Sequence, residues 1–136
     1  MSVHRIAQSL RNLEQAVLRL REALGEPESG PLTLDGTIQR FEFAFELSWK
    51  TLMHMLEAEG ITASTPRAVI REAYKAQWIS DEAAWLQMLN DRNDTSHAYN
   101  VALARKIYGH VRDNFPTLAT AAASLRDRLD KKPAGG

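Results

Sequence analysis

Arg92 and His97 are two side chains with complementary chemistry, and they stand five residues apart in the segment 91–100, DRNDTSHAYN. An arginine stays charged and can bind two oxygens of one phosphate group, whereas a histidine can gain and lose a proton near neutral pH. Together, the two side chains could hold a phosphate group and transfer protons beside it.

The spacing of this pair is not specific by itself. Twelve Arg and four His in 136 residues predict roughly 0.35 chance occurrences of the spacing. The chain indeed has a second copy, at Arg105 and His110. Only the first copy has an asparagine, Asn93, directly after the arginine and a tyrosine, Tyr99, two residues after the histidine. The segment 91–100 is therefore the candidate site.

Ordinary structural interpretations compete with a functional one. Arg92 can form a solvated ion pair with Asp91 or Asp94, and His97 can cap a helix or be half-buried. Tyr99 can be a half-buried helix tyrosine with its hydroxyl at the rim. On residue types alone, these interpretations are favoured over catalysis.

The candidate segment also predicts an interruption of the helix that contains it. Residues 93–97 all have poor helix propensity, and their side chains compete for backbone hydrogen bonds. We expect a break there, followed by a new helix capped by Asp94 or Thr95. On one unbroken helix, at about 100° per residue, Arg92 and His97 would stand about 140° apart. A break, or a symmetry-related copy that supplies the opposing pair, would let them meet.

The rest of the chain predicts helices. No segment of useful length alternates with period two, so no strand is expected. Within residues 3–24 the apolar positions are separated alternately by three and four residues, as in a coiled-coil seam, and Gly25 would end this helix. The seam is expected to pack within the bundle, with a seam between subunits as the less favoured alternative. The chain therefore predicts an all-α antiparallel bundle of four to six helices, in a single domain over residues 1–130.

A second helix is expected to begin near Asp35 or Thr37, after a loop over residues 26–36, and to run to Gly60. It carries one apolar stripe and further apolar side chains off that stripe, so it should be covered on more than one side. We therefore expect a homodimer that buries part of this helix and brings two candidate segments near a twofold axis. The side chains off the stripe are Phe43, Leu47, Trp49 and Met53.

Further helices are expected downstream. Thr65 should cap a short helix with Pro66 at its first position, and Ser80 should cap the next one. The last long helix meets Pro116, which should kink or split it. Residues 131–136 are expected to form a disordered tail. Aromatic residues at helical spacing are more often core than platforms for stacking bases, so we assign three tryptophans to the core, namely Trp49, Trp78 and Trp85.

Charge is balanced overall but uneven along the chain. The 17 Lys and Arg residues match the 17 Asp and Glu residues, which argues against coating nucleic acid or membrane by bulk electrostatics. Residues 92–112 hold four bases and one acid (+3), whereas residues 34–60 hold five acids and two bases (−3), so a local phosphate-binding face is compatible with this balance. The absence of cysteine excludes disulfides and thiol nucleophiles, and no stretch is long and apolar enough to span a membrane, so we expect a cytoplasmic protein.

Other titratable residues indicate no second site. Glu42 and Glu46 lie one helical turn apart and could suggest a carboxylate pair, but Arg40 and Lys50 favour an ion-pair network instead. We expect no metal and no cofactor, because the histidines outside the candidate segment lack neighbours with metal-ligand spacing, namely His4, His54 and His110.

The candidate segment and the expected second helix together resemble a known group of proteins. Residues 92–99, RNDTSHAY, with residues 38–43, IQRFEF, running into residues 47–50, LSWK, resemble the HEPN superfamily. More narrowly, they are similar to nucleotidyltransferase substrate-binding proteins related to HepT toxins, over about residues 5 to 130. The resemblance implies a helical bundle, a homodimer and a partner, which is a minimal nucleotidyltransferase (an MNT-type antitoxin) encoded beside it.

For HepT-like members the resemblance also implies metal-independent endoribonuclease activity. Arg92 and His97 stand at the positions of the catalytic pair, Asn93 and Asp94 at supporting polar positions, and Tyr99 at the position to which the partner adds AMP. RNA cleavage of this kind needs a base for the ribose 2′-hydroxyl, an acid for the leaving 5′-oxygen and positive charge for the phosphorane. One histidine and one arginine are too few for these roles, and a dimer would supply two of each. The alternative is a non-catalytic subunit that presents a substrate to the nucleotidyltransferase.

Overall fold

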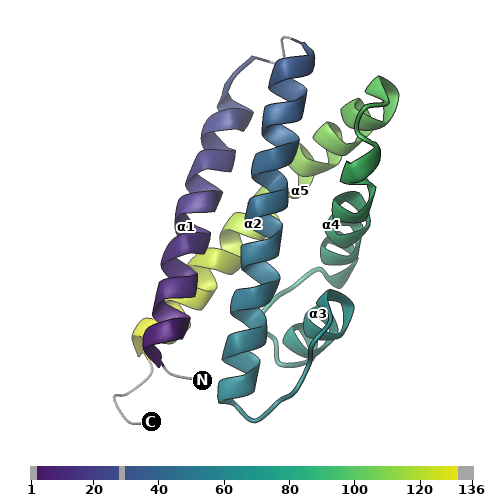
Figure 1. The fold of residues 1–136 in the computed structure, drawn as a ribbon. Helices are drawn as coiled ribbons and strands as arrows, with labels where there is room; N and C mark the ends of the chain where they lie inside the picture. Colours follow the sequence, from purple (N-terminus) through teal and green to yellow (C-terminus); the bar gives the residue numbers. More distant parts are fainter. Residues whose placement is uncertain (1–2, 28–29, 132–136) are drawn as a thin grey trace.

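The computed structural model describes residues 3–27 and 30–131, and this part of the chain is helical and contains no strand. The expected all-α bundle is confirmed. Figure 1 shows α1 and α2 side by side, with α5 crossing behind them and the short α3 beside one end of α2. The elements are α1 (Val3–Gly25), α2 (Pro31–Ala58), α3 (Pro66–Lys75), α4 (Glu82–Asp94), the short 3-10 helix η1 (Thr95–His97) and α5 (Val101–Lys131).

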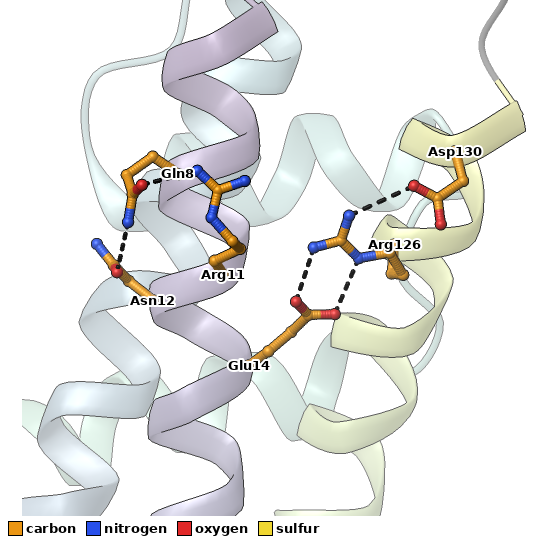
Figure 2. A network of polar contacts seen from close by, with 6 residues as sticks. All are labelled: Gln8, Arg11, Asn12, Glu14, Arg126 and Asp130. Atoms are coloured by element: carbon orange, nitrogen blue, oxygen red, sulfur yellow. Dashed lines mark hydrogen bonds and ion pairs between the residues drawn. The ribbon is translucent and has the colours of Figure 1, made fainter.

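The apolar seam of α1 packs inside the bundle, as expected. The apolar residues of the seam are buried against α2 and α5 from Ile6 to Leu20, whereas Val3 at the helix start is 66% exposed. On the neighbouring face, Glu14 accepts hydrogen bonds from Nε and Nη2 of Arg126 on α5, at 3.0 and 2.7 Å (Figure 2). These bonds lower the pKa of Glu14. A two-pronged ion pair thus joins the middle of α1 to the C-terminal part of α5.

Helix α2 begins earlier than the sequence predicts. It starts at Pro31, not at Asp35 or Thr37, and Gly30 precedes it with φ +143°. The first residue of a helix has an N–H without a helical partner, so a proline, which lacks that N–H, loses nothing there. The helix can therefore start at Pro31, about one turn before Asp35, without a side-chain cap. The helix ends at Ala58, and Gly60 follows in a left-handed conformation at φ +81°.

The other helix ends confirm one predicted cap and correct another. The Thr65 hydroxyl accepts from the Ala68 amide at 3.3 Å, with Pro66 at the first helical position. Asp81, not Ser80, caps α4, because its Oδ1 accepts from the Ala84 amide at 3.1 Å. A carboxylate at this position also interacts favourably with the helix dipole.

Helix α5 is not split at Pro116 but continues to Lys131, which the sequence places in the tail. The remainder of that tail, residues 132–136, lies outside the described residues. A proline removes one backbone hydrogen bond and costs a helix interior about 3 kcal/mol. Buried side chains such as Val111 and Leu118 hold α5 against the bundle on both sides of the proline. Their burial offsets that cost.

The core lies between α2 and its neighbours. All three tryptophans are core residues, as predicted, with Trp85 only 1% exposed. The Phe45 ring lies 6.0 Å from that of Phe41 and 6.3 Å from that of Trp85. Two apolar side chains of α2 stay outside this core, because Phe43 is 57% exposed and Leu32 is 89% exposed. No helix within the described residues is long and apolar enough to cross a membrane.

Candidate functional site

The predicted break in the candidate segment is present, but its cap differs from the expectation. Helix α4 ends at Asp94, η1 forms one short turn, and α5 begins at Val101. Neither Asp94 nor Thr95 caps α5, because η1 moves the restart further along the chain. Asn100 takes that role and accepts from the Leu103 amide at 3.1 Å. The Thr95 hydroxyl instead donates to the carbonyl of Arg92 at 2.8 Å and closes the end of α4.

Arg92 is held by a glutamate from another helix. Its Nε and Nη2 both bind Oε1 of Glu46 on α2, and its Nη1 donates to Oδ1 of Asn93 at 3.0 Å. The expected ion pair with Asp91 or Asp94 is therefore replaced by one that joins α4 to α2. Sequence reasoning could not find this partner, because 46 residues separate the two side chains.

Glu46 lies at the centre of a small network of polar groups. Its Oε2 accepts from Nε1 of Trp49 at 3.2 Å and lies 3.9 Å from Nζ of Lys50. Within the predicted ion-pair network, the pair of Glu46 with Lys50 is therefore confirmed, and Arg92 is an additional member. Arg40 lies outside it and donates to the backbone carbonyl of Arg19 at 2.9 Å.

His97 and Tyr99 lie at the junction of η1 and α5. Both side chains are exposed, and Tyr99 is 84% exposed, so the half-buried alternative for this tyrosine is wrong. Their rings meet edge to face, with centroids 6.2 Å apart. The structure contains no hydrogen bond between Arg92 and His97 in the part of the chain that it describes.

A buried carboxylate directly precedes the arginine. Asp91 is 4% exposed, and its two oxygens lie 3.0 and 3.1 Å from Nδ1 of His110 on α5. Burial raises the pKa of Asp91, and the bond to His110 opposes that rise. The nearby charge of Asp94 raises it further. The pair joins α4 to α5 near the break. His110, the histidine of the second copy of the arginine–histidine spacing, therefore has a structural role that the sequence did not reveal.

A cleft of about 410 Å³ opens beside Tyr99, between α2 and the η1–α5 junction. Two acidic side chains of α2, Asp35 and Glu42, lie on one wall, and Thr95, Ala98 and Tyr99 lie on the other. Among residues 3–27 and 30–131, no cluster of three or more His, Asp or Glu residues is placed to hold a metal ion. The cleft therefore has an exposed phenol on one wall and carboxylates on the other, and the His97 ring lies against that phenol.

Comparison with known proteins decides which family has this arrangement. Residues 8–130 match the sequence model of the family described as nucleotidyltransferase substrate binding protein like. The chain belongs to this family. The match covers the whole candidate site, and it confirms the family resemblance that residues 92–99 suggest.

Individual proteins also resemble this chain along most of its length. A Haemophilus influenzae protein named "Probable ribonuclease HepT" is 32% identical over 98 residues, which are 68% of this chain and 67% of the relative. A Thermus thermophilus protein of known crystal structure is 34% identical, with a TM-score of 0.72 over 86% of this chain and 98% of its own.

A second solved structure comes from Haemophilus influenzae and is described as revealing the fold of a substrate binding domain of a nucleotidyltransferase. That protein is 26% identical to this chain, with a TM-score of 0.67 over 92% of this chain and 99% of its own. This arrangement of helices is therefore the fold of the family.

Proposed function

We propose that this protein is a metal-independent endoribonuclease that works with a minimal nucleotidyltransferase partner. The observation that carries the proposal is the grouping at the break between α4 and α5. There, an anchored Arg92 and an exposed His97 share one segment with Tyr99. The family match and the relative named as a ribonuclease support the same function. We propose a cytoplasmic toxin whose antitoxin is the nucleotidyltransferase.

The proposed reaction is transfer of the phosphodiester to the neighbouring ribose oxygen. A base takes the 2′-hydroxyl proton, the 2′-oxygen attacks phosphorus, and the bond from phosphorus to the 5′-oxygen breaks as an acid protonates that oxygen. The products are a 2′,3′-cyclic phosphate and a 5′-hydroxyl. Histidine suits both proton transfers near neutral pH, and Arg92 would stabilise the charge on the phosphorane.

A homodimer would supply the second histidine and arginine that this reaction needs. Phe43 is 57% exposed on α2 and borders a groove of about 230 Å³ with Leu47, Arg19 and Arg40. At about 100° per residue, Phe43 lies about 60° around the helix from Glu46. A second chain covering Phe43 would therefore lie close to the Glu46–Arg92 pair, which supports a site completed at a twofold axis.

Tyr99 fits a regulatory role because its phenol is exposed and borders the cleft. In AMP addition the phenol oxygen attacks the α-phosphorus of ATP, pyrophosphate leaves, and the partner's active site takes the phenol proton. The product carries a phosphodiester anion next to His97. That anion would compete with RNA for the positive charge of the site.

A second candidate function is a non-catalytic subunit that presents a substrate to the nucleotidyltransferase. The description of the second Haemophilus influenzae structure as a substrate binding domain supports this alternative. The cleft beside Tyr99 is the place where such a substrate would bind.

Cleavage of matched oligonucleotides separates the two functions. The purified chain should cut a single-stranded RNA in EDTA and leave a DNA of the same sequence intact, because only RNA has the 2′-hydroxyl. Cleavage that vanishes with EDTA contradicts the metal-independent mechanism. An intact RNA favours the substrate-presenting subunit.

A further inference from the structure

Glu46 determines which edge of the Arg92 guanidinium is available. A guanidinium has five N–H groups in one plane. The Nε–H donates to Oε1 of Glu46, Nη2 forms an ion pair with the same oxygen, and Nη1 donates to Oδ1 of Asn93. Each terminal nitrogen has two N–H groups, so at least one on each remains beyond these contacts, and a guanidinium can bind two oxygens of one phosphate.

The carboxylate that holds Arg92 is itself fixed. Glu46 stands in the middle of α2, between the buried residues Phe45 and Ser48. Its second oxygen accepts from the Trp49 indole at 3.2 Å, and Trp49 is 8% exposed. The Glu46 side chain is thus bound at one oxygen by the core and at the other by Arg92. A long arginine side chain would otherwise sample many rotamers before binding a phosphate.

We propose that Glu46 is a positioning residue of the ribonuclease site, which presets the guanidinium of Arg92 with its outer N–H groups directed at the scissile phosphate. This inference rests on the proposed function. Glu46 does not touch RNA in this scheme, and its effect passes through Arg92. Fixing a charged group before the reaction lowers the reorganisation needed in the transition state, so Glu46 acts on kcat.

The opposite role for Glu46 is competition with RNA for the arginine. In that case the carboxylate would have to leave before a phosphate could bind, and its removal would strengthen RNA binding. The two roles predict changes of opposite sign, so one variant series distinguishes them.

The test measures kcat and KM for RNA cleavage by Glu46→Ala and Glu46→Gln. Glu46→Ala should lower kcat by about 10- to 100-fold with a smaller change in KM, because misplacing a catalytic group costs rates of this order. Glu46→Gln should keep more activity than Glu46→Ala, since its amide oxygen can still accept from Nε of Arg92. Glu14→Gln, in the other interhelical arginine pair, should leave both constants unchanged. Cleavage by Glu46→Ala at or above the wild-type rate overturns the proposal.

A spectroscopic readout tests the positioning without any cleavage. The Nε–H of Arg92, observed by ¹⁵N NMR, should exchange slowly in the wild type and in Glu46→Gln but rapidly in Glu46→Ala. Rapid exchange in the wild type overturns the positioning even if the protein cuts RNA. If the wild type cuts no RNA while the Nε–H is protected, the ribonuclease proposal fails and the Glu46–Arg92 anchor stands.

Discussion

Two arginine–glutamate pairs join distant helices in this bundle, and their surroundings differ. Glu14 and Arg126 join α1 to α5, and Asp130 at 3.3 Å is the other acid that binds this arginine. Glu46 and Arg92 join α2 to α4, beside a helix break, an exposed histidine and a cleft. The two arginines use the same three nitrogens, but Arg126 is bound by two carboxylates, whereas Arg92 is bound by one carboxylate and by the neutral amide of Asn93. The groups that bind Arg92 directly therefore neutralise less of its positive charge, which is the difference that the proposed phosphate-binding role requires.

Removing the two arginines should separate activity from stability most clearly. Arg92→Ala should lower RNA cleavage by about 100- to 1000-fold, the range for loss of one transition-state donor. Arg126→Ala should keep cleavage but lower the thermal midpoint by a few degrees, in line with about 1 kcal/mol for a partly exposed pair. Cleavage rates and calorimetry on both variants check this. Equal loss of cleavage in both would mean that the two pairs do not differ in role.

Breaking the proposed dimer should affect the Arg92 site and not the Arg126 pair. Phe43→Glu replaces an exposed aromatic side chain of α2 by a charge, so the chain should become monomeric and lose at least about ten-fold of its cleavage rate. Leu32→Glu is the matched control, because Leu32 is 89% exposed on the same helix. Light scattering with a cleavage assay checks both variants. A monomeric wild type that cleaves RNA would contradict the composite site.

Modification should likewise be confined to the region around Arg92. With the partner nucleotidyltransferase, ATP and Mg²⁺, AMP should appear on Tyr99, and Tyr99→Phe should prevent it while changing cleavage less than about two-fold. Tyr74→Phe is the control, since Tyr74 is also exposed but lies on α3. Mass spectrometry of the peptides locates the AMP. Addition at Tyr74, or only to a small molecule, argues against the regulatory role.

The smallest effect concerns the buried carboxylate beneath the break. Burial raises the pKa of Asp91 above the ordinary 3.8 that the unfolded chain keeps. At a pH between 3.8 and the raised pKa, the folded protein therefore binds more protons than the unfolded chain. This group therefore favours folding at low pH, and that contribution is lost as the pH rises through the raised pKa. Asp91→Asn should remove this pH dependence. Thermal unfolding from about pH 3.5 to pH 7 measures it, and an unchanged slope relative to wild type would refute the assignment.

The local features of the candidate site were predictable from sequence, and its long-range contacts were not. The break at residues 93–97 follows from five consecutive residues with poor helix propensity. The burial of the three tryptophans follows from their helical spacing. The starts of α2 and α4 were misplaced because a proline at one and an aspartate at the other offered competing signals. Glu46 and His110 were missed as partners of Arg92 and Asp91, because only the folded bundle brings these pairs together.

The most direct test of the ribonuclease site is RNA cleavage by His97→Ala beside wild type, in EDTA, with the product ends identified. His97 is exposed and its ring lies against that of the exposed Tyr99, so its loss should leave the thermal midpoint nearly unchanged. We predict 2′,3′-cyclic phosphate ends from the wild type and no cleavage by His97→Ala. Cleavage by His97→Ala at the wild-type rate would contradict the site.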